Sequence, residues 1–451
     1  MKYLTPQIIA GITGGKYIGG EDSRCVRVMG AVRDNRDVKP GNLFVCICGA
    51  RVDGHSFVNS AFESGAACCL VEQKIQDATG PLVLVESTLE AIKALGAYYR
   101  NLFKIPVIGI TGSVGKTTAK ELIAAVLGAK LRVLKTPMNL NNELGVPLTL
   151  LSLCESHEAA VIEMGISSFG EMGRLAGMVR PDIFVMTKIG YSHIDELGDL
   201  NGVLRAKSEA IAHMDQSGAV LVNGDDDLLW GYDPGIRKIT FGFSTRNDYR
   251  SENVLLKGVD AVICDVVSGS ERITVMIPAY GSHLASLAPA AVAVGRLLGL
   301  RAEDISRGIS SYVPVGGRSN VKHTGFITLI DDCYNANPHS VKAALTSLSA
   351  LPGKHVAIIG DMFGLGENSD ELHSEIGAFA AQCGINSFVC CGSKMAFAYD
   401  SYKSAGGGPA FYYPDKSNLI TALPGLIEKG DNVLVKASHA MQFEEVTQLL
   451  M

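Results

Sequence analysis

The segment GITGSVGKTT, residues 109–118, decides the fold class. It joins the apolar run 105–110, typical of a buried strand, to the run 116–127, whose apolar residues have helical spacing. A glycine-rich turn in that position lets the backbone wrap a phosphate, with amides and a helix N-terminus as donors. Lys116 would neutralise phosphate charge and the Thr117 hydroxyl would ligate magnesium, so we expect ATP as the ligand. An ordinary strand-to-helix turn is the structural alternative.

Strand-like and helix-like runs alternate on the C-terminal side of this segment. The apolar runs are residues 159–163, 183–187 and 219–222, and a helical pattern at 169–178 follows the first of them. Such alternation predicts an α/β fold with a doubly wound parallel sheet, whose ligands lie at the carboxyl ends of the strands.

The chain length of 451 residues exceeds what one hydrophobic core usually supports, and we predict three domains. Residues 1–102 form a small α/β domain, with strands at 43–47, 67–71 and 81–85 and helices at 56–64 and 88–102. Residues 103–314 form the central ATP-binding domain. After the linker-like VPVGG at 313–317, residues 315–451 form a Rossmann-like domain with strands at 327–330, 355–359, 387–390 and 432–435.

Composition excludes several functional classes. The formal net charge of -6 and the absence of a Lys/Arg-rich run argue against a nucleic-acid partner. We expect a cytoplasmic protein without membrane insertion, because the N-terminus resembles no signal peptide and no apolar run reaches bilayer length. The 11 cysteines include no Cys-x-x-Cys spacing, which favours reduced thiols over zinc or disulfides.

Two further side chains follow predicted strands. Glu163 ends the apolar run 159–163, which places a carboxylate at the ligand-binding edge of the sheet. A buried carboxylate there is costly without a cation, although helix capping is the alternative. His193 follows the run 183–187 in the same way, and a lone histidine at such a position is more often structural.

Three segments resemble the Mur ligase family. TGSVGKTT at 111–118 is similar to the family's phosphate loop, T-G-x-x-G-K-[ST]-T, which explains why Ile110 stands where the usual loop has its first glycine. PMNLNNELGVPLT at 137–149 and IDDCYNANP at 330–338 are similar to segments of the family's D-alanyl-D-alanine-adding members. The resemblance implies ATP- and Mg²⁺-dependent ligation of D-alanyl-D-alanine to UDP-N-acetylmuramoyl-tripeptide through an acyl phosphate, in peptidoglycan precursor synthesis, by a protein we expect to be monomeric.

The resemblance also implies roles for individual residues. Magnesium would be held by Thr117, Glu163, His193 and Lys207, the last matching a lysine that several family members carry as a carbamate. The catalytic set would be Lys116, Glu163, His193, Lys207 and Arg318, with Arg318 meeting the γ-phosphate. Nucleotide contacts would come from Gly112, Ser113, Val114, Gly115, Lys116, Thr117, Thr118, Arg318, Asp332, Asn335 and Asn337. For Lys207 a solvated helix-face lysine remains the alternative.

The substrate-binding residues implied by the resemblance fall in two places. Asn139 and Asn142 would bind a peptide or phosphoryl oxygen, whereas in the alternative they cap a helix or form Asx turns. Asp34, Arg36 and Arg51 resemble the module that binds the UDP sugar, with surface salt bridges as the alternative.

The resemblance weakens at two positions. Leu284 and Leu287 stand where related sequences often have asparagines, one of which would address adenine. His439 stands where an arginine is common, which removes a fixed fork of donors. Two alternatives remain open: a related ligase with another amino-acid or folate substrate, and a catalytically silent scaffold of the same fold.

Overall fold

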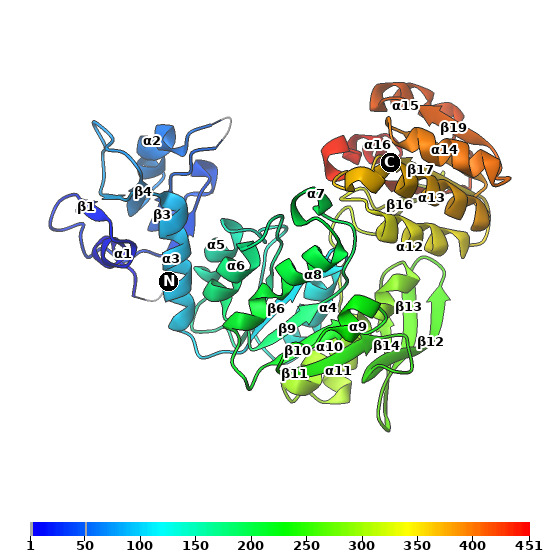
Figure 1. The fold of residues 1–451 in the computed structure, drawn as a ribbon. Helices are drawn as coiled ribbons and strands as arrows, with labels where there is room; N and C mark the ends of the chain where they lie inside the picture. Colours follow the sequence, from blue (N-terminus) through cyan, green and yellow to red (C-terminus); the bar gives the residue numbers. More distant parts are fainter. Residues whose placement is uncertain (1–2, 50–51) are drawn as a thin grey trace.

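The computed structural model describes residues 3–49 and 52–451, which form three sheets in succession along the chain (Figure 1). The sheets have five, nine and six strands. Parallel pairing dominates each of them, so the predicted mixed α/β fold class is confirmed. In the part of the chain so described, no helix has the length and apolar character needed to cross a bilayer.

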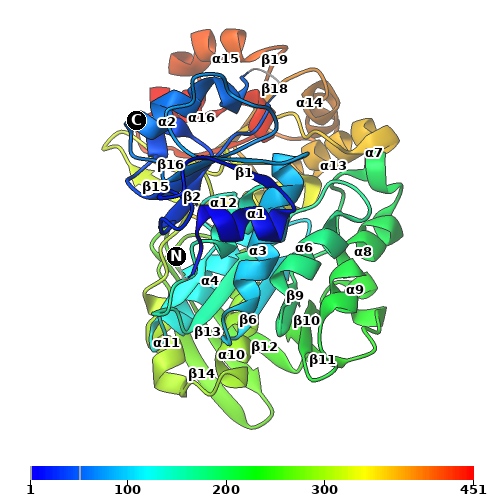
Figure 2. The ribbon, with the colours of Figure 1, turned by 90° about the vertical axis from the view of Figure 1, so that its left-hand side faces the viewer.

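The first sheet has the strand order β1-β5-β4-β3-β2. Its strands are β1 (Lys16–Ile18), β2 (Gly30–Val32), β3 (Asn42–Val45), β4 (Cys68–Val71) and β5 (Leu82–Leu84). The helices of this part are α1 (Pro6–Thr13), α2 (Val58–Glu63) and α3 (Thr88–Asn101). In Figure 2 α1 lies across α3, against which it packs.

Helix α3 connects the first sheet to the second part of the molecule. It packs on α5 (Gly145–Leu150) and α6 (Glu171–Val179), and one buried cluster joins its Leu95 to Val146 and Leu175. The Tyr99 hydroxyl also donates a 3.0 Å hydrogen bond to the carbonyl oxygen of Leu153. The base of the first domain is therefore fixed on the central domain by apolar packing.

The second sheet has the order β14-β13-β12-β11-β10-β9-β6-β8-β7. Its parallel strands are β6 (Val107–Thr111), β7 (Val133–Lys135), β8 (Ala159–Glu163), β9 (Ile183–Met186), β10 (Ala219–Asn223) and β11 (Arg237–Gly242). Buried clusters line both faces. One face is covered by α4 (Lys116–Gly128), α10 (Ala288–Leu297) and α11 (Ala302–Ser310), the other by α3, α6 and α8 (Leu200–Ser208).

The edge of this sheet differs from the predicted parallel arrangement. Strands β12 (Tyr249–Lys257), β13 (Ala261–Ser268) and β14 (Glu271–Ile277) pair antiparallel to one another, and β12 joins β11 in parallel. Tight turns at Gly258 and Gly269, both with positive φ, connect them. The sequence prediction left these strands out, so the central sheet is mixed at this edge.

The third sheet has the order β15-β16-β20-β17-β18-β19. Its strands are β15 (Asn320–His323), β16 (Thr328–Asp331), β17 (His355–Gly360), β18 (Ser387–Cys391), β19 (Ala410–Tyr413) and β20 (Asn432–Lys436). Among the described strands of this third sheet, β15 and β16 form the one antiparallel pair. Buried clusters on both faces involve α12 (Pro338–Ser349), α13 (Ser369–Gln382), α14 (Met395–Ser404), α15 (Lys416–Ala422) and α16 (Glu444–Leu449).

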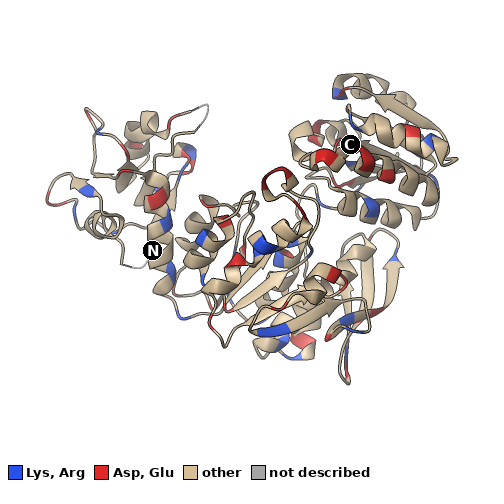
Figure 3. Ribbon diagram, in the orientation of Figure 1, with Lys and Arg blue, Asp and Glu red and all other residues tan. Residues whose placement is uncertain are grey.

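Charged residues are interspersed over all three parts of the chain (Figure 3). This distribution agrees with the net charge of -6. The 11 cysteines are free thiols in this structure.

Candidate active site

A pocket of about 530 Å³ lies where the carboxyl ends of the central strands face the third domain. It gathers most of the residues expected to bind nucleotide. Those that line it are Ser113, Val114, Gly115, Lys116, Thr117, Thr118, Arg318, Asp332, Asn335 and Asn337, and the predicted magnesium ligand Glu163 lines it as well. The pocket therefore joins the phosphate loop to the DDCYNANP segment, which are more than 200 residues apart in sequence.

Two glycines shape the phosphate loop. Gly112 has φ 144°, and a Cβ at this position would lie 2.0 Å from Thr187 Oγ1. Gly115 has φ 83° and precedes the first turn of α4. Both positions need a residue without a side chain, since L residues rarely adopt such φ values. The resulting turn directs the N-terminus of α4 into the pocket.

Lys116 begins α4 with its ammonium folded back on the loop. Its Nζ donates a 2.7 Å hydrogen bond to the carbonyl oxygen of Gly112. Burial lowers the pKa of Lys116, the Glu163 carboxylate raises it, and the Arg318 guanidinium lowers it. The site thus concentrates positive charge that an anion entering the pocket would neutralise.

Glu163 ends β8 and is only 1% exposed. Its Oε2 accepts a 2.9 Å hydrogen bond from the Thr117 hydroxyl, and its Oε1 accepts a 2.8 Å bond from Asn141 Nδ2. One carboxylate beside one hydroxyl fits magnesium, which usually takes one or two carboxylates and completes its shell with phosphate oxygens and water.

His193 and Lys207 do not line the pocket, although the Lys116 ammonium at its wall influences both side chains. Lys207, on α8, is 2% exposed, and its pKa is well below the ordinary value because of burial and the nearby Lys116 ammonium. His193 precedes α7 (Ile194–Leu197) with φ 56°. Loss of water lowers the His193 pKa, and so do the ammonium groups of Lys207 and Lys116. Within residues 3–49 and 52–451, no three His, Cys, Asp or Glu side chains cluster as a ready-made metal site.

The third domain contributes a buried ion pair to the pocket. Lys436 Nζ donates to Asp332 Oδ2 at 2.7 Å and to the carbonyl oxygen of Asn335 at 2.8 Å. The other carboxylate oxygen of Asp332 accepts a 2.9 Å bond from the Ser319 amide. Asn337 caps α12 by accepting a 2.9 Å bond from the Ser340 amide. These bonds fix the segment within the third domain, where Asp332, Asn335 and Asn337 line the pocket.

Arg318 and His439 both contact the ring of Tyr334. The guanidinium carbon of Arg318 lies 3.9 Å from the ring centroid, and the ring of His439 lies 5.4 Å from it. A guanidinium over an aromatic face is stabilised by cation–π attraction. Arg318 is thereby held at the pocket wall, and the imidazole of His439 packs where a guanidinium was expected.

The apolar departure noted in the sequence lies beside the phosphate loop. Leu284 and Leu287 both line the pocket. Two polar atoms nearby, Tyr280 Oη and His283 Nδ1, are buried without a hydrogen-bond partner among the described residues. The leucines thus give this wall an apolar surface, as their sequence predicted.

The remaining expected substrate residues lie outside the pocket. Asn142 forms an Asx turn just before α5, accepting bonds from the amides of Leu144 at 3.3 Å and Gly145 at 2.9 Å, and Asn139 lies in the preceding turn. Asp34 accepts bonds of 2.9 and 2.6 Å from the Arg36 guanidinium, which hold the pKa of Asp34 down at about 2. Two of the structural alternatives, an Asx turn at Asn142 and a surface salt bridge between Asp34 and Arg36, are thus present. Arg51 lies outside the described residues.

Sequence reasoning missed three residues of this site. Asn141 contacts Glu163 although only its neighbours Asn139 and Asn142 were predicted, and adjacent amides in a loop carry no signal that separates them. Lys436 was not among the predicted site residues, yet it pairs with Asp332. His339 lines the pocket, and its ring lies 3.0 Å from where a Cβ on Gly190 would be.

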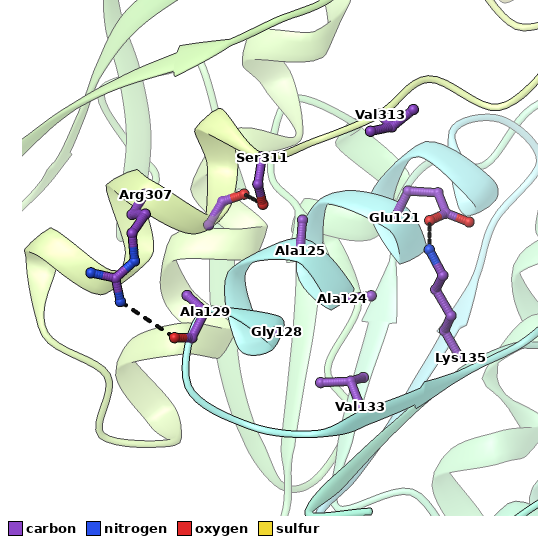
Figure 4. A pocket seen from close by; sticks show the side chains of 11 residues that line it. Glu121, Ala124, Ala125, Gly128, Ala129, Val133, Lys135, Arg307, Ser311 and Val313 are labelled. Carbon is purple, nitrogen blue, oxygen red and sulfur yellow. Dashed lines mark hydrogen bonds and ion pairs between the residues drawn. The ribbon is translucent and has the colours of Figure 1, made fainter.

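A second hollow, of about 590 Å³, lies between α4, β7 and α11 (Figure 4). Its wall includes Ala125, Gly128, Arg307 and the ion pair between Glu121 and Lys135. None of the predicted site residues lines it. The chemistry therefore concentrates in the first pocket.

Three family models match the chain in order. They are the Mur ligase family catalytic domain at residues 31–100, the Mur ligase middle domain at 110–295 and the Mur ligase glutamate ligase domain at 317–439. A Bacillus subtilis UDP-N-acetylmuramoyl-tripeptide--D-alanyl-D-alanine ligase is 36% identical over 427 residues, which cover 93% of each chain. The chain belongs to the Mur ligase family. An Escherichia coli Mur ligase of the same name is 33% identical, over 92% of each chain.

Solved structures of Mur ligases agree over the whole chain. Crystal structure I of MurF from Acinetobacter baumannii superposes with a TM-score of 0.88 at 30% identity and covers 98% of both chains. The Thermotoga maritima MurF ligase, in complex with ADP, gives a TM-score of 0.81 at 28% identity and covers 94% of this chain and 97% of its own.

Proposed function

We propose that this Mur ligase couples ATP hydrolysis to ADP and phosphate with formation of an amide bond between UDP-N-acetylmuramoyl-tripeptide and D-alanyl-D-alanine. One observation carries the proposal. A single pocket combines the Lys116 phosphate loop, the Thr117–Glu163 pair, and Arg318 with Asp332 from the third domain. Relatives named for this reaction are 26–36% identical over nearly the whole chain.

The first step is phosphoryl transfer to the terminal carboxylate of the tripeptide. A carboxylate oxygen attacks the γ-phosphorus, the bond to the β-phosphate oxygen breaks, and an acyl phosphate and ADP form. Lys116 and Arg318 stabilise the charge that spreads over the transferred group, because both bring cationic donors to the same pocket. Thr117 and Glu163 would hold magnesium, which supplies further charge stabilisation when bound.

The second step is attack of the D-alanyl-D-alanine amine on the acyl carbon. The tetrahedral intermediate collapses, and phosphate leaves with the carboxylate oxygen that attacked in the first step. The protein contributes chiefly alignment here, which contributes on the order of 7 kcal/mol or more to such reactions. Arg318 and Asp332 come from the third domain, so closure of that domain on the loop assembles the site.

Lys207 is proposed to act as a carbamate. Its amine is buried and its pKa is strongly lowered, so the neutral form that attacks carbon dioxide is favoured. The neutral nitrogen bonds to the carbon of CO₂ and loses a proton, which leaves a carbamate anion near the Lys116 ammonium. The carbamate would be stabilised by that ammonium and would supply magnesium with an anionic oxygen ligand, beside the imidazole of His193.

The three parts of the chain have separate tasks in this proposal. Residues 1–102 bind the UDP end of the acceptor, with Asp34, Arg36 and Arg51 as its candidate contacts. Residues 103–314 bind ATP and magnesium, with Asn139 and Asn142 near the peptide, and residues 315–451 bring the dipeptide. The protein would act as a monomer in the cytoplasm, where UDP-linked precursors are made.

Phosphate release tests the proposal. The chain is incubated with ATP, magnesium and UDP-N-acetylmuramoyl-tripeptide, with and without D-alanyl-D-alanine, beside the Lys116→Ala variant. Release that needs both substrates and is lost in the variant is expected. Release with another amino acid or a folate instead would assign the chain to a related ligase, and no release under any condition would leave a silent scaffold.

A further inference from the structure

Lys120 is buried one helical turn beyond Lys116 in α4. Its side chain is 0% exposed, and it does not line the nucleotide pocket. A buried ammonium is costly unless charges and hydrogen-bond acceptors surround it. Lys120 has no role in the two proposed reaction steps, and its contacts indicate a different one.

Three donors of the Lys120 ammonium have three close acceptors. Nζ lies 2.8 Å from the carbonyl oxygen of Thr136, 3.4 Å from that of Met138 and 3.0 Å from Glu121 Oε1. Glu163 Oε2 is 3.9 Å away. Lys120 therefore hydrogen-bonds the backbone that follows β7 and acts on Glu163 mainly through its charge.

The backbone that Lys120 holds also carries the partners of Glu163. The Thr136 hydroxyl accepts a 2.9 Å bond from the Glu163 amide, so Thr136 joins the lysine to the end of β8. Met138, with φ 46°, starts the turn that brings the Asn141 amide to Glu163 Oε1. Without the Lys120 ammonium, the carbonyl oxygens of Thr136 and Met138 would lose the hydrogen bonds that hold this turn.

A second carboxylate balances the charge of Lys120 on its other side. Glu121 pairs with Lys120 through Oε1 and with Lys135 through Oε2. Figure 4 shows the outer pair at the wall of the second hollow, where Lys135 is 49% exposed. Two lysines and two glutamates thus alternate from the protein surface to the phosphate loop, and Lys120 lies between the two carboxylates.

We propose that Lys120 is a positioning residue for the magnesium-nucleotide site. It holds the Glu163 carboxylate against Thr117, and it holds the turn at 136–141 so that the Asn141 amide fixes the other carboxylate oxygen. It does so without touching nucleotide or metal. The proposal rests on the proposed function, because it assigns Glu163 to that site.

Calorimetric titration with ADP, with and without magnesium, provides a test that does not depend on turnover. For Lys120→Met we expect affinity for ADP with magnesium to fall roughly tenfold or more, since partners that orient a metal ligand typically contribute 10–100-fold. Affinity for ADP without magnesium should change less than about threefold, because the phosphate loop itself is intact. The matched control is Lys135→Met, which removes the exposed partner of the same glutamate and should behave as the natural chain.

Steady-state kinetics of phosphate release separate positioning from general damage. Lys120→Met should raise the half-saturating magnesium concentration and lower kcat at saturating ATP and acceptor. Where Lys120→Met does not fold, Lys120→Arg decides. The larger planar guanidinium keeps the charge but cannot place a donor at the position of the compact Lys120 Nζ without shifting the turn, so a raised magnesium requirement is expected again.

Wild-type magnesium dependence in whichever of these variants folds would overturn the proposal. So would an equal loss of ADP affinity with and without magnesium, which would mean that Lys120 supports the loop as a whole. These outcomes differ from failure of the proposed function, because in that case the natural chain itself would not release phosphate in response to its two substrates.

Discussion

Removal of the Lys436 ammonium is predicted to destabilise the third domain and leave the central domain intact. Lys436 is 3% exposed and donates to Asp332 Oδ2 at 2.7 Å. Lys436→Met leaves a nearly buried carboxylate whose remaining partner is the Ser319 amide. Breaking a buried pair from one side costs about 3–5 kcal/mol. Because the Asp332 side chain keeps 13% exposure and one hydrogen bond, we expect the lower end, about 3 kcal/mol.

Hydrogen exchange resolves this effect within one domain. The amides of β16 and β20 should exchange roughly 100- to 200-fold faster in Lys436→Met, since each 1.4 kcal/mol is a factor of ten. The double variant with Asp332→Asn also removes the unpaired charge, so its cost should fall to about 1–2 kcal/mol. Lys354→Met is the control, because its pair with Glu428 is exposed and should contribute under about 1 kcal/mol. A cost for Lys436→Met as small as that of the control would refute the reasoning.

Three further predictions concern the loop, the carbamate and pH. Gly112→Ala should abolish phosphate release and lower the free energy of unfolding by roughly 2–3 kcal/mol, because the new Cβ would collide with Thr187 Oγ1. In the control Gly128→Ala the new Cβ enters open space, so the melting temperature and the activity should stay unchanged. Activity measured in CO₂-depleted buffer should fall and return on adding bicarbonate, and Lys207→Ala should show no such response; a bicarbonate response in that variant would contradict the carbamate. Burial lowers the pKa of His339 from 6.5 to about 4, so the folded state favours the neutral ring. The contribution of His339 to the free energy of unfolding is therefore fully present above pH 6.5 and is lost as the pH falls toward 4. His339→Gln should reduce the acid-induced loss of unfolding free energy by about 1–2 kcal/mol, a figure lowered because the His339 ring is partly exposed to solvent. If the variant lost stability with pH as the natural chain does, His339 would not be the cause of that loss.

The sequence predicted the strands that end at the pocket because they are buried on both faces. The run 159–163 coincides with β8, and the runs 183–187 and 219–222 differ from β9 and β10 by one residue. Continuous apolar strands followed by polar residues have few competing interpretations. The same pattern placed Glu163 at the sheet edge, where it meets Thr117.

The antiparallel strands at 249–277 carried a signal that the prediction did not use. In ERITVMI, residues 271–277, buried Ile273, Val275 and Ile277 alternate with more exposed residues, and the glycine turns at 258 and 269 separate three strands. Period-two alternation with turn residues is the ordinary hairpin pattern. The expectation of a wholly parallel sheet outweighed it.

Contacts between distant segments could not be predicted from the residues themselves. The pairing of Lys436 with Asp332 depends on how the ends of β20 and β16 lie side by side in the third domain. The approach of His339 to Gly190 depends on how the third domain meets the central domain. The choice of Asn141 over Asn139 and Asn142 depends on the turn that starts at Met138. Local sequence specifies which side chains are available, and tertiary packing selects among them.

The fate of one oxygen atom tests the central claim most directly. The tripeptide acceptor is prepared with ¹⁸O in its terminal carboxylate and incubated with ATP, magnesium, D-alanyl-D-alanine and the natural chain, and the released phosphate is analysed by mass spectrometry. The account predicts that each phosphate carries one oxygen from the carboxylate, because that oxygen attacks the γ-phosphorus and leaves with it. Phosphate without the label, formed together with the amide product, would contradict an acyl phosphate, and unlabelled phosphate without amide product would reduce the activity to ATP hydrolysis.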